Sequence, residues 1–339
     1  MTNRRSTTTS LHVERRLPAD FLAGALRADA RAGLTSTPKS LPPKWFYDAA
    51  GSELFEKITG LPEYYPTRAE REILQSAAGQ IAALSGAGTL VELGSGSSEK
   101  TRLLIDALRA ARSLRTYVPV DVSEPALVAA AIALLTEYPG LEVRAVVSDF
   151  EQELGLPAPG SRGGAPGAKG RRLVAFLGST IGNLLPGQRA AFLARIRAAL
   201  GEGDSLLLGT DLVKDPAVLL AAYDDAAGVT AAFNQNVLSV LNTELGADFD
   251  LDAFEHVAAW DPEREWIEMR LRAATAQTVH LPAIELTARL EAGEEMRTEV
   301  SAKFRRDRIT AELAATGFTM QEWWTDSQGR FGLSLSVPA

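Results

Sequence analysis

Two glycines and a lysine after a short apolar stretch form the clearest candidate for a cofactor site. Gly94 and Gly96 follow the apolar residues 89–93, and Glu99 and Lys100 come next. A strand, a glycine turn and a helix present backbone amides to a nucleotide. Glu99 stands where a dinucleotide site needs a third glycine, and its charge would oppose phosphate in a P-loop. S-adenosylmethionine carries no phosphate, so the turn favours that cofactor; a structural turn without a ligand is the alternative.

Carboxylates and an aromatic residue follow at the ends of the next predicted strands. Asp121 is placed to accept hydrogen bonds from ribose hydroxyls. Asp149 could accept the adenine amino group, and Phe150 could flank the base. An isolated Asp at a strand end is more often a cap or a turn residue, so the prediction depends on these residues meeting at one sheet edge. The predicted strands cover residues 89–93, 115–120, 141–147, 173–177 and 205–209.

Other catalytic chemistries find little support in the sequence. The loop at 178–183 resembles a nucleophile elbow with Thr180 in the serine position, but no later Asp and His pair is well placed to complete a triad. The histidines are His12, His256 and His280. The chain has no cysteine and no H-E-x-x-H pattern, so we expect no metal.

Length and charge are typical of a soluble enzyme with a small-molecule substrate. At 339 residues the chain is long enough for two domains. Its net charge of -8 disfavours nucleic acid and anionic membranes as partners. The first residues lack the apolar segment of a secretory signal, and no apolar run is long enough to span a bilayer. We therefore expect a cytoplasmic protein that acts as a monomer.

The elements that must position these residues are not contiguous in the chain. Residues 1–17 are expected to be a flexible tail, and the Gly- and Pro-rich residues 157–170 a flexible surface loop. Residues 215–245 are mostly helical in pattern, with Asp215 and Pro216 as N-cap and first helical residue. Strand-like segments at 265–274 and 284–304, a helix at 306–316 and a closing hairpin of 318–324 with 331–337 complete the pattern.

A parallel sheet that ends in an antiparallel hairpin predicts a class I methyltransferase fold. The fold class is then α/β, a Rossmann-like sheet for S-adenosylmethionine with an antiparallel C-terminal hairpin. Residues 69–213 and 304–339 would form this domain. Residues 18–68 and 214–303 are expected to fold together as a discontinuous α+β substrate domain over the cofactor.

Seven segments in a fixed order carry a more specific resemblance. They are Lys39–Asp48, Leu61–Arg68, Val91–Gly96, Phe176–Leu184, Leu208–Val213, Tyr223–Thr230 and Glu295–Ser301. Together they resemble the actinobacterial L-histidine Nα-methyltransferases of ergothioneine biosynthesis, over roughly residues 20 to 338. The longer N-terminal tail and the loop at 157–170 depart from that family and touch none of the seven segments.

The resemblance implies a reaction and a set of contacts. The reaction is stepwise transfer of three methyl groups from S-adenosylmethionine to the α-amino nitrogen of free L-histidine, which gives hercynine. The positions matching those that hold the cofactor are Gly94, Lys100, Asp121, Asp149 and Phe150, with Lys100 at the cofactor's carboxylate. For histidine they are Tyr64, Asn183 and Tyr223 at its amino and carboxylate end, Glu299 and Ser301 at the imidazole, and Tyr47 and Met269 as further pocket positions.

These residue types suit the implied chemistry. Methyl transfer from a sulfonium is an in-line displacement, so the amine must be neutral and aligned, and positioning supplies most of the catalysis. An α-amino group titrates near about 8, and a neighbouring sulfonium cation favours its neutral form. A dedicated base is then unnecessary. Asn183 can aim the nitrogen lone pair through its carbonyl oxygen, and the ring of Tyr47 suits a growing alkylammonium ion.

Specificity is expected at the imidazole end. Glu299 can accept one imidazole N–H and Ser301 can satisfy the other nitrogen, so a substrate without these atoms would leave buried groups unpaired. Two alternatives remain open from the sequence: an N-methyltransferase of another free amino acid, and a non-catalytic module that binds S-adenosylmethionine.

Overall fold

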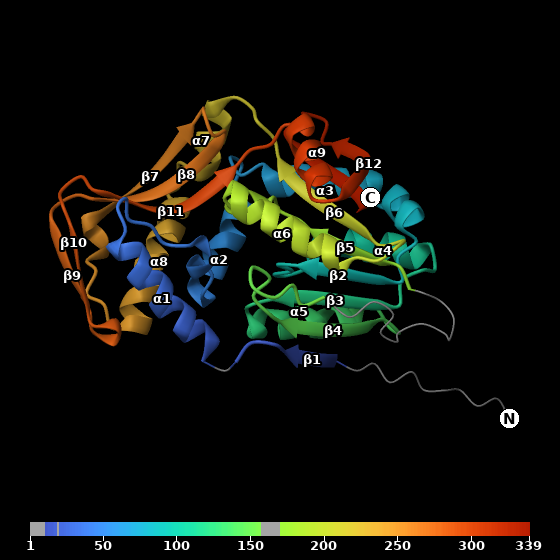
Figure 1. Cartoon of the computed structure of the whole chain (residues 1–339), viewed down its shortest axis with the longest axis horizontal. Coiled ribbons are helices and arrows are strands. Elements are labelled where there is room, and N and C mark those ends of the chain that lie inside the picture. Colours follow the sequence, from blue (N-terminus) through green and yellow to red (C-terminus); the bar gives the residue numbers. More distant parts are fainter. Residues whose placement is uncertain (1–10, 19, 157–169) are drawn as a thin grey trace.

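The chain is organised around one eight-stranded sheet (Figure 1). The computed structural model describes residues 11–18, 20–156 and 170–339. The strands follow the order β1, β4, β3, β2, β5, β6, β13, β12; all pairs from β1 to β6 are parallel, and β13 is antiparallel to both neighbours. This confirms the predicted methyltransferase sheet with its C-terminal hairpin. The bounds are β1 Leu11–Arg15, β2 Thr89–Leu93, β3 Thr116–Asp121, β4 Glu142–Val147, β5 Arg172–Phe176, β6 Ser205–Asp211, β12 Phe318–Thr325 and β13 Phe331–Pro338.

Helices cover both faces of this sheet because successive strand residues are apolar. Leu90 and Val91 are neighbours on β2 and both fully buried, yet they belong to two different cores, one on each face. Strands buried on both faces need such continuous apolar runs. The helices on one face are α3 (Pro66–Ser85), α4 (Thr101–Ala110) and α5 (Glu124–Glu137), and those on the other are α6 (Pro186–Ala199) and α9 (Arg306–Ala315).

Beside the large sheet lies a smaller part built from segments far apart in the sequence (Figure 1). Its three-stranded antiparallel sheet has the order β11, β8, β7. The ring centroids of Phe46 and Phe233 lie 4.8 Å apart, which ties the N-terminal segment to α8. The elements of the smaller part are α1 Phe21–Thr35, η1 Pro43–Phe46, α2 Ala49–Thr59, α7 Pro216–Tyr223, α8 Val229–Leu245, η3 Leu251–Ala253, β7 Phe254–Asp261, β8 Trp266–Ala273, β9 Gln277–Leu281, η4 Pro282–Ile284, β10 Leu286–Leu290 and β11 Glu295–Ala302.

The chain leaves the large sheet after β6 and returns after β11 at the same place. Leu212 and Phe304 form an isolated parallel bridge. The Phe304 N–H donates to the Asp211 carbonyl at 2.8 Å, and the Val213 N–H donates to the Phe304 carbonyl at 3.0 Å. The two crossings are therefore hydrogen-bonded to each other.

Most predicted elements are confirmed, and one expectation needs correction. Residues 11–15 of the supposed tail form β1, an edge strand that pairs in parallel with β4. Leu11 and Val13 pack against the small buried cluster of Leu127, Ala145 and Val147. The mostly helical pattern expected over 215–245 is confirmed as two helices, with a break between Tyr223 and Val229. Residues 1–10 and 157–169, which carry most of the predicted tail and nearly all of the predicted loop, lie outside the described residues.

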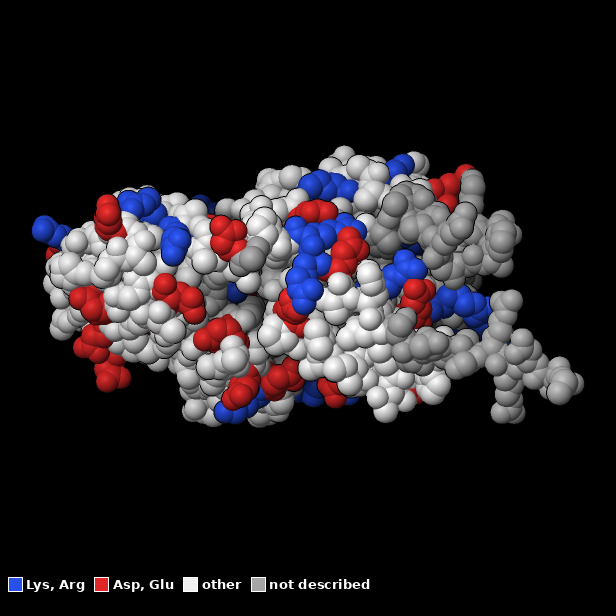
Figure 2. Space-filling view, turned by 90° about the horizontal axis from the view of Figure 1, so that it is seen from below, with Lys and Arg blue, Asp and Glu red and all other residues white. Residues whose placement is uncertain are grey.

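The surface carries both signs of charge. On the face in Figure 2, Asp and Glu are interspersed with Lys and Arg across both parts of the molecule. In the three described ranges, no helix is both long and apolar enough to cross a membrane.

Candidate active site

The glycine turn after β2 adopts the left-handed backbone that its sequence permits. Gly94 has a φ of 67° and Gly96 a φ of 47°. The Gly94 N–H donates to the Val120 carbonyl at 2.8 Å, and a Cβ added at Gly94 would stand 3.5 Å from the Phe150 ring. The turn, the end of β3 and the residues after β4 therefore meet in one cradle at the carboxyl edge of the sheet, where open α/β folds bind ligands.

Asp121 is fixed by the backbone of this cradle. Its Oδ2 accepts the Gly96 N–H and its Oδ1 accepts the Ser123 N–H, both at 3.0 Å. Burial raises the pKa of Asp121, and these two hydrogen bonds oppose that effect. Each oxygen keeps a second lone pair, so the carboxylate fits a pair of ribose hydroxyls.

The predicted adenine contacts lie beyond β4. Asp149 is buried, and its Oδ1 accepts the Glu151 N–H at 2.9 Å. Its Oδ2 stands 3.9 Å from the Nζ of Lys44, which comes from the smaller part. The Phe150 ring packs edge-on against Phe176 with centroids 5.3 Å apart, which holds it beside the cradle. The carboxylates of Asp121 and Asp149 are acceptors, and Phe150 offers a ring. Together these groups fit an adenosine.

Lys100 is held by a residue that the sequence did not single out. Its Nζ donates to Glu70 on α3, which is fully buried. The Glu70 oxygens also lie 2.9 and 3.0 Å from the Gly178 N–H that they accept. Lys100 therefore lies at the cofactor edge with a carboxylate partner, and its contact with the cofactor stays a prediction.

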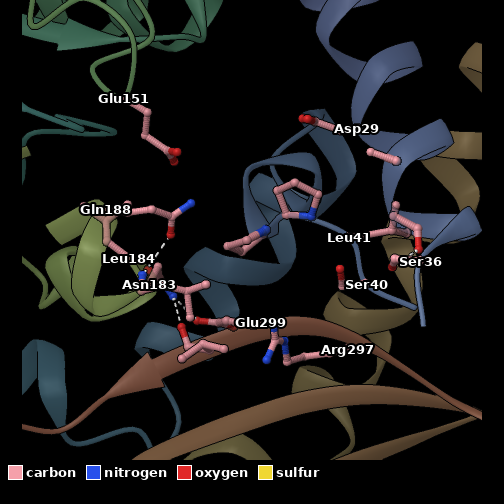
Figure 3. Close-up of a pocket in the computed structure, with 16 residues that line it drawn as sticks. Asp29, Ser36, Ser40, Leu41, Glu151, Asn183, Leu184, Gln188, Arg297 and Glu299 are labelled. Atoms are coloured by element: carbon pink, nitrogen blue, oxygen red, sulfur yellow. Dashed lines mark hydrogen bonds between the residues drawn. The ribbon is translucent and has the colours of Figure 1, made fainter. Parts of the chain in front are cut away.

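A pocket of about 310 Å³ opens between the large sheet and the smaller part. Figure 3 shows Glu151, Gln188 and Asn183 on one side, Asp29 and Ser40 on the other, and Glu299 below them on β11. Asn183 ends the 3₁₀ turn η2 (Thr180–Asn183) after β5. The remaining lining residues are Ala32, Gly33, Ser36, Leu41, Pro42, Pro43, Leu184, Leu185, Arg297 and Val300.

Asn183 and Glu299 meet directly across this pocket. The Asn183 Nδ2 donates to the Glu299 carboxylate at 2.6 Å and to the Val300 carbonyl at 2.9 Å. Both amide hydrogens are then occupied, so Oδ1 of Asn183 is left as an acceptor. Burial raises the pKa of Glu299 to about 7. The hydrogen bond from Asn183 and the charge of Lys303 lower this pKa and so partly oppose the effect of burial. Glu299 can change its charge near neutral pH.

Tyr223 and Ser301 form a second polar pair. Their hydroxyl oxygens are 2.7 Å apart, and Lys303 donates to Tyr223 Oη at 2.8 Å and to Ser301 Oγ at 2.9 Å. Ser301 follows Glu299 by two residues on β11, so both side chains lie on one face of that strand. The structure thus joins members of the two predicted histidine-binding sets, and the assignment of each set to one end of histidine stays a prediction.

The remaining predicted residues of the histidine site are Tyr47, Tyr64 and Met269. Tyr47 is 43% exposed, and its ring packs against Phe55 at 5.5 Å; Phe55 also contacts Tyr64 at 6.2 Å. The Tyr47 ring also packs edge-on against Phe233 of α8 at 5.4 Å. Tyr47 therefore lies on the smaller part of the molecule, with part of its side chain open to solvent. Met269, buried on β8, is the residue opposite Glu299 in the sheet.

Comparison with known proteins decides the family. A family model described as "Histidine-specific methyltransferase, SAM-dependent" matches residues 26–338. The chain belongs to this family. This methyltransferase is 60% identical over 322 residues to the Histidine N-alpha-methyltransferase of Mycolicibacterium smegmatis, covering 95% of the chain and 97% of the relative. The Histidine N-alpha-methyltransferase of Mycobacterium tuberculosis is 58% identical over 313 residues, with 92% and 95% covered. The Ergothioneine biosynthesis protein 1 of Neurospora crassa is 30% identical over 248 residues, with 68% and 28% covered.

A buried charged cluster of this methyltransferase was missed by sequence reasoning. Asp211 at the end of β6 accepts the Tyr65 hydroxyl at 2.8 Å, the Lys214 ammonium at 2.6 Å and the Lys303 ammonium at 2.9 Å. Burial alone would raise the pKa of Asp211, but the two ammonium groups outweigh it and lower the pKa. Asp211 stands at a strand end, the same signal that indicated Asp121, and that signal could have found it.

Proposed function

We propose that this methyltransferase transfers three methyl groups in turn from S-adenosylmethionine to the α-amino nitrogen of L-histidine, giving hercynine. The observation that carries the proposal is the contact between Asn183, at the cofactor edge of the large sheet, and Glu299, on β11 of the smaller part. It places a carboxylate able to recognise an imidazole beside the edge where the methyl donor would bind. The high identity to the two mycobacterial histidine enzymes supports the same substrate.

The cofactor, when bound, supplies a methyl group on a cationic sulfur. The side chains of the protein then have to hold and aim the amine. Asn183 uses both amide hydrogens on Glu299 and Val300, so its Oδ1 can accept an amine N–H and direct the nitrogen lone pair away from that bond. An amine that titrates near about 8 supplies its neutral form without a base of its own. The ammonium left by each of the first two transfers loses its extra proton to solvent before the next transfer, and alignment supplies the rate.

Successive transfers demand room and tolerance for charge. After the third transfer the nitrogen is a quaternary cation without hydrogens, so Asn183 can no longer hold it by a hydrogen bond. The partly exposed ring of Tyr47 offers a π face to that cation. We therefore propose that Asn183 serves the early transfers and that Tyr47 stabilises the later, methylated forms.

We also propose the pathway to which the reaction belongs, the division of the chain into domains, and the state in which the enzyme acts. The relative named for ergothioneine biosynthesis supports hercynine formation as the step that begins that pathway. We propose that residues 18–68 and 214–303 form the substrate-binding domain, supported by the packing of α2 and η1 on α8. We further propose that the enzyme acts in the cytoplasm as a monomer without a metal, which gel filtration and activity in a chelator would test.

Mass spectrometry of the reaction products tests the function. Purified protein is incubated with S-adenosylmethionine and L-histidine, and with other free amino acids in parallel. Trimethylated histidine as the main product supports the proposal. Methylation of another amino acid but not of histidine would contradict the substrate and retain the cofactor. Failure to form S-adenosylhomocysteine with every amino acid would indicate a binding module without catalysis.

A further inference from the structure

Lys303 is a buried cation whose presence is not explained by the charge of its carboxylate partner. It is fully buried, two residues beyond Ser301. Asp211 is already neutralised by Lys214, at 2.6 Å, and receives the Tyr65 hydroxyl as well. A second buried ammonium is costly unless it is hydrogen-bonded throughout. Lys303 therefore adds a positive charge beside Ser301, opposite in sign to Glu299.

All three hydrogens of the Lys303 ammonium have a partner. They point to Asp211 Oδ2 at 2.9 Å, Tyr223 Oη at 2.8 Å and Ser301 Oγ at 2.9 Å. An ammonium group only donates, so each hydroxyl oxygen must accept from it. Between them the two hydroxyls hold two hydrogens, and one of these lies in the 2.7 Å bond that joins the oxygens. One hydroxyl hydrogen is left to point away from the cluster.

The remaining hydrogen belongs to Ser301. Either hydroxyl could donate in the bond between them. Because a phenol is ordinarily more acidic than an aliphatic hydroxyl, we take Tyr223 as the donor to Ser301 Oγ. Ser301 Oγ then accepts two hydrogen bonds, one from Lys303 and one from Tyr223, and both its lone pairs are occupied. Ser301 can only donate to a ligand. The atom it meets has to be an acceptor, such as the unprotonated nitrogen of a neutral imidazole.

We propose that Lys303, anchored by Asp211, is a positioning residue that makes Ser301 a donor and so selects the neutral imidazole of the substrate in one tautomer. This rests on the proposed function. Glu299 accepts the N–H of one ring nitrogen and Ser301 donates to the other, two residues apart on the same face of β11. An imidazolium carries a hydrogen on both nitrogens, so one N–H would face the Ser301 hydroxyl hydrogen without an acceptor. Its positive charge would also be repelled by Lys303.

A double-mutant cycle separates this role from a structural one. The variants are Lys303→Met, Ser301→Ala and the double variant, with Lys57→Met as a control at an exposed lysine. Calorimetry measures L-histidine binding in the presence of S-adenosylhomocysteine. Each single change should weaken histidine binding about 10- to 100-fold. Because Lys303 acts through Ser301, the double variant should be little worse than either single one. Full additivity of the two losses, or loss of S-adenosylhomocysteine binding in Lys303→Met, would overturn the proposal.

Nuclear magnetic resonance of the unmodified enzyme supplies a test that no folding defect can obscure. Histidine labelled with ¹⁵N in the ring, bound together with S-adenosylhomocysteine at about pH 7.5, should show one protonated and one unprotonated nitrogen with distinct shifts. Two protonated nitrogens, or one averaged shift, would refute the role of Lys303 while leaving histidine as the substrate. Absence of histidine binding and methylation by the unmodified enzyme would instead contradict the proposed function, and the proposal for Lys303 with it.

Discussion

Replacement of Glu299 by glutamine should weaken histidine binding in a way that depends on pH. The change keeps the shape of the side chain and removes its charge. A hydrogen bond to a charged group is worth about 1.5–3 kcal/mol and a neutral one about 0.5–1.5 kcal/mol, so the difference is about 1.4 kcal/mol, or roughly 10-fold in Kd. This loss applies only where the carboxyl of the unmodified enzyme is ionised.

The pKa of about 7 for Glu299 sets the range of pH. The carboxyl is mostly ionised above this value and mostly protonated below it, so the unmodified enzyme loses its charged acceptor as the pH falls. One unit below the pKa only about a tenth of the carboxyl is ionised, and most of its advantage over glutamine is lost. We expect a Kd ratio of roughly 10 at about pH 8 and about 2 at about pH 6.

Calorimetry with saturating S-adenosylhomocysteine measures both affinities across this range. The imidazole of free histidine also titrates near about 6.5, but it does so for both proteins and cancels in the ratio. Glu263→Gln, at an exposed position, is the matched control and should leave the affinity unchanged. A ratio that stays constant between the two pH values would refute the assignment of Glu299 as the ionised acceptor, and so would an equal loss of S-adenosylhomocysteine affinity.

Three further substitutions test other parts of the structure. Asp121→Asn should weaken S-adenosylhomocysteine binding about 5- to 100-fold, because one ribose acceptor becomes a donor; calorimetry that shows no change would remove Asp121 from the cofactor site. Tyr47→Leu should slow the third methyl transfer more than the first, by about 2- to 30-fold, because the ring face that attracts the alkylammonium is lost; mass spectrometry should show mono- and dimethylhistidine accumulating, and an unchanged product ratio would contradict the role. Asp204→Ala should lower the free energy of unfolding by about 3–5 kcal/mol, because the buried Arg172 at 2.6 Å would keep its charge without this carboxylate; a denaturant midpoint equal to that of the unmodified protein would be the contrary result.

The parts of the fold that were predictable are those encoded in local pattern. The strands with a glycine turn or a carboxylate at their ends, and the final hairpin, have periodic apolar residues and turn signals within a few positions of one another. The edge strand β1 was mistaken for a tail because Leu11 and Val13 alternate with charged residues over only five positions, and what orders it is its pairing with β4. No local pattern specifies that partner.

The site was predictable only where a motif names the residue. Asn183 and Glu299 are 116 positions apart, and only the resemblance to a family, not the spacing, brought them together before the structure did. Glu70 and Lys303 carry no signal of their own, because a charged residue in a helix or after a strand is normally exposed. Their burial is a tertiary property, because the fold surrounds both groups with hydrogen-bond partners from distant parts of the chain.

Three crossings of the chain between the large sheet and the smaller part meet at one cluster. Tyr65 precedes α3, Asp211 ends β6 and Lys303 follows β11, and the three side chains are hydrogen-bonded around a single carboxylate. For protein engineering this defines breakpoints near residues 65, 212 and 304. A chimera recombined there would exchange most of the proposed histidine-binding surface and leave β2, β3 and β4 untouched. Such a chimera should fold only if the groups that donate hydrogen bonds to Asp211 are kept.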